Sequence, residues 1–306
     1  MMDLDADQLR TLAAVIDQGT FERAAEALRI TPSAVSQRMK ALEQRAGRVL
    51  VLRTKPIWPT AAGSILLRLA RQVALLEAEA IGALGSDGAT ARPVIPLVVN
   101  ADSLATWVLP ALASLPEVSF DIVLDDQAHT LDRLRDGTVM AAITSQPEPL
   151  PGCVVTRLGS MRYRPCASPG FVARWLPNGF TRSALGVAPM LVFDRKDALQ
   201  DRYLAAHDPG AHPPRHHVPA SADFVRAAEL GLGWGMLPDL QSDPLLADGR
   251  LVVLDTRGTL DVPLYWQQWA VESGTLASVA AVLERAAAVA IPLPANARLA
   301  TRSIGP

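Results

Sequence analysis

The strongest constraint on this chain lies in residues 21–43, where two short amphipathic segments follow each other with one break. Residues 21–30 read FERAAEALRI and residues 31–43 read TPSAVSQRMKALE. Thr31 is a favourable N-cap, and Pro32 stands at the first helical position, where a missing N–H costs nothing. Two helices joined this closely predict a helix-turn-helix.

The electric charge of the chain is unevenly distributed. Between Arg29 and Arg71 there are nine Lys or Arg residues and one acidic residue, Glu43, whereas the whole chain has a net charge of -2. The remainder of the chain therefore carries -10. A local basic block attracts a phosphate backbone, and an acidic remainder does not. Double-stranded DNA is the partner that this pattern predicts for the N-terminal part.

The second of the two helices has one apolar face and one polar face. Val35, Met39 and Leu42 recur at helical spacing and should face a small core. An ordinary solvated helix face is the alternative interpretation of the polar side, but the surrounding arginines favour contact with DNA. The expected DNA-binding residues are Thr31, Pro32, Ser33, Ser36, Gln37, Arg38, Lys40, Arg53 and Lys55.

Residues 49–59 predict a short hairpin or wing, because their prolines exclude a helix. From Thr60 onward the pattern changes to a long helix whose apolar residues alternate at spacings of four and three. This heptad pattern favours a partner helix, although packing on the same chain is the alternative. The expected dimerisation residues are Leu66, Leu69, Val73 and Leu76.

The sequence predicts a second domain after a linker of small residues. We expect a winged helix-turn-helix domain at 1–60, a dimerisation helix at 61–85 and a hinge at 86–93. The second domain, 94–306, should have a first lobe at about 94–164 and 265–295 and a second at about 165–264. Crossovers are expected at 162–167 and 262–269.

Short apolar runs alternate with helical stretches in this second domain, which predicts parallel sheets covered by helices. The expected strands are Ile95–Val99, Phe120–Leu124, Val139–Thr144 and Met190–Phe193. The expected helices are Thr130–Arg135, Ala198–Ala205 and Ala222–Leu230. The fold class is therefore α/β, preceded by an all-α winged helix-turn-helix.

The composition excludes several classes of protein. The longest uncharged run, residues 103–116, has 14 residues and two prolines, too short to span a bilayer. The first seven residues carry three aspartates and do not resemble a secretory signal, so that we expect a cytoplasmic protein. Cys153 and Cys166 fit no zinc or CxxC spacing, and no metal or cofactor is expected.

An enzyme is the first competing hypothesis. Four histidines occur between His207 and His217, but prolines mark this segment as a loop and the spacing fits no metal signature. Gly231–Gly235 reads GLGWG and is followed by MLP instead of an opening helix, so that it is not a nucleotide fingerprint. A regulator without enzymatic activity is the stronger interpretation.

The N-terminal motif resembles that of the LysR-type transcriptional regulators. The residues that carry the resemblance are Phe21, Ala24, Ala25, Leu28, Thr31, Ser33, Ala34, Val35, Ser36, Met39, Leu42 and Glu43. Three further segments resemble the ArgP/LysG (IciA-like) branch, which controls export of basic amino acids: Asn100–Trp107, Pro177–Ala184 and Ser221–Val225. Met39 and Pro32 depart from the usual pattern, so that the operator sequence does not transfer.

The resemblance implies a dimer or tetramer that binds DNA, contacts RNA polymerase and holds a small-molecule effector between two α/β lobes, as a periplasmic binding protein does. For this branch the implied effector is L-lysine or L-arginine, and the implied role is activation of an exporter gene. A regulator of another effector is one alternative. A replication-origin or nucleoid DNA binder without a ligand switch is the other.

Candidate effector residues lie at predicted strand ends and helix starts, where α/β sheets bind ligands. Ser103 is the expected anchor for an α-carboxylate. A cationic ligand requires carboxylates, although about half of the aspartates at such positions should only cap helices. The candidates are Asn100, Asp102, Ser103, Leu104, Asp125, Asp126, Thr144, Ser145, Asp194, Ser221 and Asp223.

Overall fold

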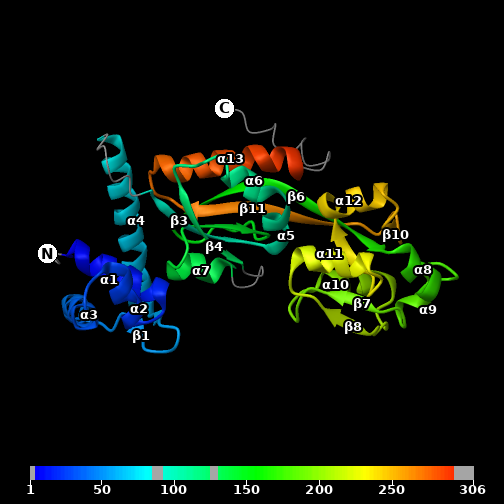
Figure 1. Ribbon diagram of the computed structural model, residues 1–306, viewed down its shortest axis with the longest axis horizontal. Coiled ribbons are helices and arrows are strands. Elements are labelled where there is room, and N and C mark those ends of the chain that lie inside the picture. Colours follow the sequence, from blue (N-terminus) through cyan, green and yellow to red (C-terminus); the bar gives the residue numbers. More distant parts are fainter. Residues whose placement is uncertain (1–3, 85–91, 125–129, 293–306) are drawn as a thin grey trace. The chain divides into compact units, whose positions relative to one another are not determined.

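The structure is a computed structural model of all 306 residues, of which 4–84, 92–124 and 130–292 are described. The chain forms two compact units (Figure 1). Unit one comprises Met1–Val99, Ser114–Thr156 and Trp266–Ala281, and unit two comprises Asn100–Ala113, Arg157–Tyr265 and Val282–Pro306. The predicted Asp125 and Asp126 lie outside the described residues.

The N-terminal part of unit one is the predicted three-helix arrangement: α1 (Ala6–Gln18), α2 (Phe21–Leu28) and α3 (Pro32–Ala46). Thr31 caps α3, because its Oγ1 accepts a 3.1 Å hydrogen bond from Ala34 N. The turn between α2 and α3 passes through Arg29, a non-glycine residue at φ 55°. Val35, Met39 and Leu42 are buried, as their spacing predicts.

The wing follows as β1 (Val51–Leu52) antiparallel to β2 (Trp58–Pro59). Next comes the long helix α4 (Ala61–Ala83), capped by Thr60. Gly63 on α4 lies so close to the residue that precedes β1 that a Cβ there would be 1.9 Å from Leu50 O. The helix is therefore seated directly on the wing backbone.

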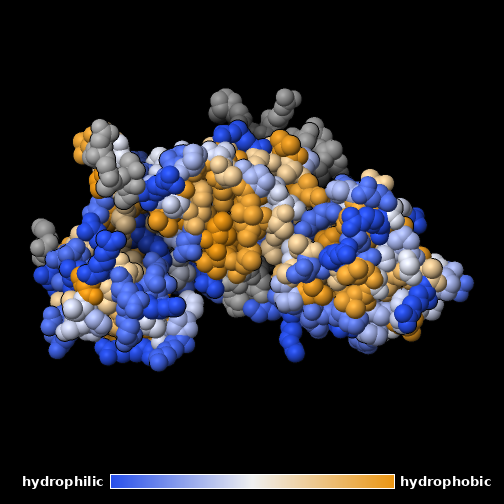
Figure 2. Space-filling view, in the orientation of Figure 1, coloured by the Kyte–Doolittle hydropathy of each residue, from blue (hydrophilic) through white to orange (hydrophobic). Residues whose placement is uncertain are grey.

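The rest of unit one contains a parallel sheet of β3 (Val94–Val99), β4 (Ser119–Leu124) and β5 (Ala141–Thr144), with β3 in the middle. Helix α7 (Thr130–Asp136) precedes β5, and the first part of α13 (Gly274–Ala290) also belongs here. The strands and α7 appear where the apolar runs predict them. Figure 2 shows an apolar area of surface in the region of β4. Leu124, the last residue of β4, is 57% exposed.

Unit two begins with a helix in three parts: α5 (Ala101–Ser103), the π-helical turn η1 (Leu104–Val108) and α6 (Leu109–Leu112). The predicted first lobe includes this segment, whereas the structure places it in unit two, where Asp102 is hydrogen-bonded to residues far along the chain. The strands β6 (Cys153–Ala167) and β11 (Leu260–Trp269) run from one unit into the other. β11 changes unit after Tyr265, inside the crossover predicted at 262–269, whereas β6 changes unit after Thr156, ahead of the crossover predicted at 162–167.

The other elements of unit two surround these strands. They are α8 (Pro169–Trp175), α9 (Arg182–Leu185), β7 (Met190–Val192), α10 (Leu199–His207), β8 (Arg215–His217), α11 (Ser221–Glu229), β9 (Gly235–Pro238), α12 (Asp239–Ala247) and β10 (Val252–Val253). β7 and β8 are parallel. β9 and β10, however, pair antiparallel with β6. This sheet is therefore mixed, whereas the sequence predicts purely parallel sheets.

Candidate functional sites

The polar face of α3 is open to solvent. Ser33, Ser36, Gln37 and Lys40 are exposed, as are Thr31 and Pro32 at the start of the helix. Arg53 and Lys55 are exposed on the loop of the wing. A helix face and a flanking basic loop that are both open can contact base edges and phosphates respectively.

Arg38 differs from its neighbours on α3. Its Nη2 lies 3.0 Å from Asp7 Oδ2 on α1, and its side chain is only 34% exposed. The guanidinium is thus held against the N-terminal helix. Contact of Arg38 with DNA stays a prediction, as it does for the other residues of this face.

Some apolar residues of α4 pack in the core of the N-terminal domain, and others are exposed to solvent. Leu66 is buried in the core of the three-helix domain, and Leu69 packs partly against that core. Val73 is half-buried and Leu76 is 43% exposed. Ile65 and Leu84 are exposed by 71% and 82%. The amino-terminal part of the heptad pattern is therefore used within the chain, whereas the later part leaves an apolar face open.

A polar cluster in unit two surrounds the carboxylate of Asp102. The hydroxyl of Tyr163, on β6, donates a 2.7 Å hydrogen bond to Asp102 Oδ2. The hydroxyl of Ser221, the first residue of α11, donates a 2.6 Å hydrogen bond to Asp102 Oδ1 and lies 3.2 Å from Gln241 Oε1. Three elements that are distant in sequence thus meet at one carboxylate.

Two polar atoms beside Asp102 are buried without a partner among the described residues: Asn100 Oδ1 and Ser103 Oγ. Ser103 itself is fully buried. Buried polar groups in proteins are normally hydrogen-bonded, so that each exception requires an explanation such as a bound ligand or water. The unpaired groups and the Asp102 carboxylate lie within four consecutive residues.

The electrostatics of this cluster are negative. Burial raises the pKa of Asp197; hydrogen bonds from Phe193 N and Leu199 N oppose that rise, and the charges of Asp194 and Asp102 reinforce it. Burial also raises the pKa of Tyr163 well above its ordinary value, with the Asp102 carboxylate adding to the effect, so that Tyr163 remains a neutral donor. No Lys or Arg within the described ranges forms an ion pair with Asp102.

The other predicted effector residues have different positions. Asp194 Oδ1 accepts hydrogen bonds from Lys196 N and Asp197 N, as a turn cap, and Asp223 is exposed in the first turn of α11. Thr144 is buried at the end of β5 and, with Ser145, belongs to unit one. Leu104 is half-buried in η1.

Sequence reasoning did not identify Tyr163, Asp197 and Gln241 as members of this cluster. Tyr163 lies inside the segment predicted as a crossover, and a tyrosine in an apolar strand ordinarily indicates packing. Asp197 was a detectable candidate, because it stands three residues after Asp194, just before a predicted helix. Gln241 carried no signal in the sequence.

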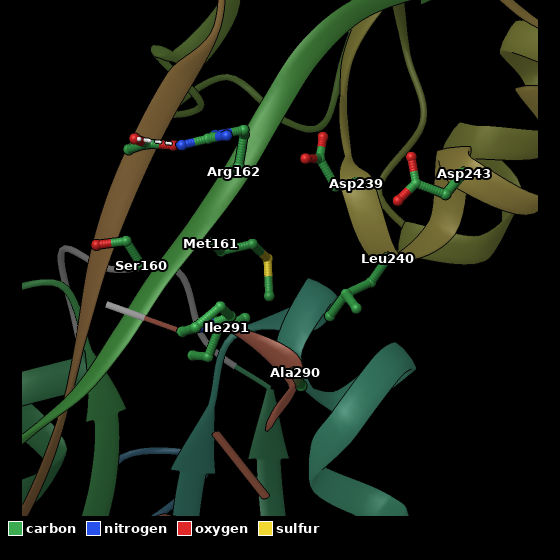
Figure 3. A pocket seen from close by; sticks show the side chains of 10 residues that line it. Ser160, Met161, Arg162, Asp239, Leu240, Asp243, Ala290 and Ile291 are labelled. Atoms are coloured by element: carbon green, nitrogen blue, oxygen red, sulfur yellow. Dashed lines mark hydrogen bonds and ion pairs between the residues drawn. The ribbon is translucent and has the colours of Figure 1, made fainter. Parts of the chain in front are cut away.

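A hollow of about 290 Å³ elsewhere in unit two resembles a binding site less closely than the Asp102 cluster does (Figure 3). Met161 and Leu240 contribute apolar atoms to it. Its charges are already satisfied: Arg162 Nε lies 2.9 Å from Asp261, and Arg164 contacts Asp239 and Asp243 at 2.6 and 2.9 Å. Groups of His, Cys, Asp or Glu that could hold a metal ion do not occur in the described part of the chain, and no helix there is long and apolar enough to cross a membrane.

Comparison with protein families decides the identity of the two halves. Residues 6–64 match the bacterial regulatory helix-turn-helix protein of the lysR family, and residues 91–290 match the LysR substrate binding domain. The chain belongs to the LysR family of bacterial transcriptional regulators. The helix-turn-helix prediction and the prediction of a regulator that is not an enzyme are both confirmed.

Named relatives of this LysR-family regulator match nearly its full length. The chain is 47% identical over 286 residues to the HTH-type transcriptional regulator LysG of Mycobacterium tuberculosis (strain ATCC 25618 / H37Rv), covering 93% of this chain and 94% of that protein. It is 43% identical over 280 residues to the HTH-type transcriptional regulator ArgP of Aeromonas salmonicida, covering 90% and 93%. The predicted LysG/ArgP branch is thereby confirmed.

Solved structures agree with this assignment. The crystal structure of ArgP from Mycobacterium tuberculosis superimposes with a TM-score of 0.82 at 45% identity, covering 95% of this chain and 100% of that one. Full-length LysG from Corynebacterium glutamicum with bound effector Arg superimposes with a TM-score of 0.74 at 39% identity, with the same coverage. The predicted fold class is confirmed.

Proposed function

We propose that this regulator binds a basic amino acid, L-arginine or L-lysine, at the Asp102 site and in response activates the gene of an exporter for that amino acid. The observation that carries the proposal is the Asp102 carboxylate, which has two neutral donors, Tyr163 and Ser221, and no cationic partner in the described part of the chain. The nearby carboxylate of Asp197 adds negative charge. A cationic ligand would neutralise both.

The Asp102 site lacks a cationic partner among the described residues, and this predicts the chemistry of the ligand. A guanidinium or ammonium group supplies several N–H donors, which carboxylate oxygens accept in strong charge-assisted hydrogen bonds. The α-carboxylate would be anchored at Ser103, whose buried hydroxyl has no partner among the described residues. The relative from Corynebacterium glutamicum has Arg bound as effector, which supports a basic amino acid for this chain as well.

Calorimetric titration of the full-length protein with L-arginine, L-lysine and L-citrulline tests the proposal. Citrulline has nearly the shape of arginine but no positive charge, so that it should fail to bind where arginine and lysine bind. Asp102→Asn should weaken binding of both cationic ligands by about 10- to 100-fold, because it removes charge-assisted hydrogen bonds. Asp248→Asn, which removes an exposed carboxylate of the same unit, is the matched control and should bind as the wild type does.

The results also separate the alternative functions. Equal binding of citrulline and arginine would reject recognition of a cation and indicate another effector. Absence of binding by any amino acid, with DNA binding intact, would favour a nucleoid or replication-origin protein without a ligand switch.

Assembly is part of the same proposal. The open apolar face of α4 around Val73 and Leu76 suits a second copy of the helix, and two half-sites on DNA require a dimer. We further propose a tetramer that contacts RNA polymerase in the cytoplasm. Leu76→Asp, on this open face, should give monomers in sizing chromatography, and an unchanged elution volume would reject this helix as the dimer contact.

A further inference from the structure

Arg71 is the one Lys, Arg, Asp or Glu in the described part of the chain whose residue is buried. It lies on α4, and its guanidinium reaches two other elements of unit one. Nε donates a 2.9 Å hydrogen bond to Gly137 O, between α7 and β5. Nη2 lies 2.5 Å from Asp17 Oδ1 near the end of α1. One side chain therefore connects the helix-turn-helix domain, the long helix and the loop that precedes β5 in the second domain.

Arg68 makes a second contact of the same kind, one turn earlier on α4. Its Nη2 donates a 2.5 Å hydrogen bond to Gly152 O, and its guanidinium lies 5.2 Å from the centre of the Trp269 ring. Gly137 also approaches α4 closely. Its φ is +83°, and a Cβ on it would be 3.2 Å from Ser64 O. The loops on either side of β5 thus both rest on α4.

A contact made only for stability would not need these charges. A buried ion pair contributes little more than well-packed apolar side chains of similar volume, because removing both charges from water is costly. The planar guanidinium does fix direction, since its N–H groups form a rigid fork. Burial raises the pKa of Asp17, and Arg71 partly offsets that rise, which agrees with a pair held away from water.

We propose that Arg71 is the positioning residue that transmits ligand binding to the DNA-binding domain. Arg71 and Arg68 hold the two loops that flank β5. This strand ends at Thr144, which the sequence predicts as an effector-binding residue. A displacement of β5 would move the Gly137 carbonyl, and the rigid fork of Arg71 would carry this movement to Asp17 and α1. The role in the response to ligand depends on the proposed function, whereas the mechanical connection itself does not.

The experiment compares Arg71→Met with Arg10→Met in the full-length protein. Arg10 is an exposed arginine that also contacts α4, through Glu77 at 2.8 Å, but it forms no hydrogen bond or ion pair with the described part of the second domain. Operator DNA is selected from random sequence by the wild-type protein. DNA bending is then measured by fluorescence energy transfer between the fragment ends, with and without L-arginine, and binding of L-arginine is measured by calorimetry.

We expect L-arginine to change the bend of DNA bound by the wild-type protein. Arg71→Met should bind DNA and L-arginine within about threefold of the wild type but should lose this change, whereas Arg10→Met should keep it. Arg71→Lys, which keeps the charge without the fork, should show a reduced change and guards against misfolding of the Met variant. A full bending response in both Arg71 variants, or an equal loss in Arg10→Met, would overturn the proposal.

Hydrogen exchange separates a failure of this inference from a failure of the proposed function. If the wild type binds no arginine, the proposed function fails, and the connection is then judged on the ligand-free proteins. Exchange of the amides of residues 137–140 should be at least tenfold faster in Arg71→Met than in Arg10→Met. Equal rates would show that Arg71 does not hold this loop.

Discussion

The hydroxyl of Ser221 donates a 2.6 Å hydrogen bond to the carboxylate of Asp102, although 119 positions separate the two residues in sequence. The bond fixes the start of α11 against the first turn of the helix that follows Asn100. It also leaves the Asp102 carboxylate oriented by neutral donors, so that its charge is available to a ligand.

Ser221→Ala should weaken binding of L-arginine by roughly fivefold, because one hydrogen bond is worth about 1 kcal/mol. The effect should be smaller than that of Asp102→Asn, since the carboxylate itself remains. Calorimetric titration gives the measurement. Ser183→Ala, an exposed serine of the same unit, should bind arginine with unchanged affinity. A loss as large as that of Asp102→Asn would mean that Ser221 contacts the ligand directly.

The pairing of Asp102 with Ser221 shows what sequence patterns can locate. Asp102 stands at a helix start after an apolar strand and was a candidate for that reason. Ser221 was a candidate because it begins a segment, Ser221–Val225, that resembles the ArgP/LysG branch. Tyr163 was not a candidate. Its hydroxyl reaches Asp102 only because of the register in which the long strand β6 pairs with β9. Periodicity predicts which residues face a core, but not which distant side chain meets them.

The N-terminal domain was predictable in more detail for a physical reason. Its helices are capped by local residues such as Thr20 and Thr31, and its core follows helical spacing, so that the information lies within a few turns of each residue. The position of Arg71 depends instead on Gly137 and Asp17, 66 and 54 positions away. An arginine on an apolar helix face gives no indication of such partners.

Contact between the wing and DNA can be tested through its dependence on salt. Arg53→Ala should reduce the slope of log affinity against log salt concentration by about 1 for each copy of the wing that contacts a phosphate. Fluorescence anisotropy with a labelled operator fragment at several salt concentrations measures the slope. Arg257→Ala removes an exposed arginine of unit two and should leave the slope unchanged. An identical slope for both variants would place Arg53 away from the DNA backbone.

The thiol of Cys166 should react much more slowly than an exposed thiol does. Burial raises the pKa of Cys166 to about 12, so that almost none of it is thiolate near pH 8. In a Cys153→Ala variant, Cys166 should therefore react with Ellman's reagent at least about a thousandfold more slowly in the folded protein than in urea. Rapid reaction of the native variant would mean that β6 opens to solvent around this residue.

Glu79 on α4 should stabilise the protein in a pH-dependent way. Its Oε1 accepts hydrogen bonds from Ser273 Oγ at 2.6 Å and Thr275 N at 2.8 Å, at the start of α13. Burial acts to raise the pKa of Glu79, but these hydrogen bonds outweigh it and the pKa is lowered. A carboxyl group with a lowered pKa in the folded state stabilises that state above its unfolded pKa of about 4.3, and the stabilisation is lost as the pH falls through the folded value.

Glu79→Gln should accordingly lower the free energy of unfolding by roughly 0.5–1 kcal/mol near pH 7, the usual contribution of an acidic side chain at a helix N-terminus. Urea denaturation followed by circular dichroism measures it. The difference from the wild type should shrink as the pH is lowered below about 4, because the wild-type carboxyl is then protonated as well. Glu284→Gln, an exposed position on α13, should have no such effect. A difference that stays constant down to pH 3 would show that Glu79 acts through its shape and not through its charge.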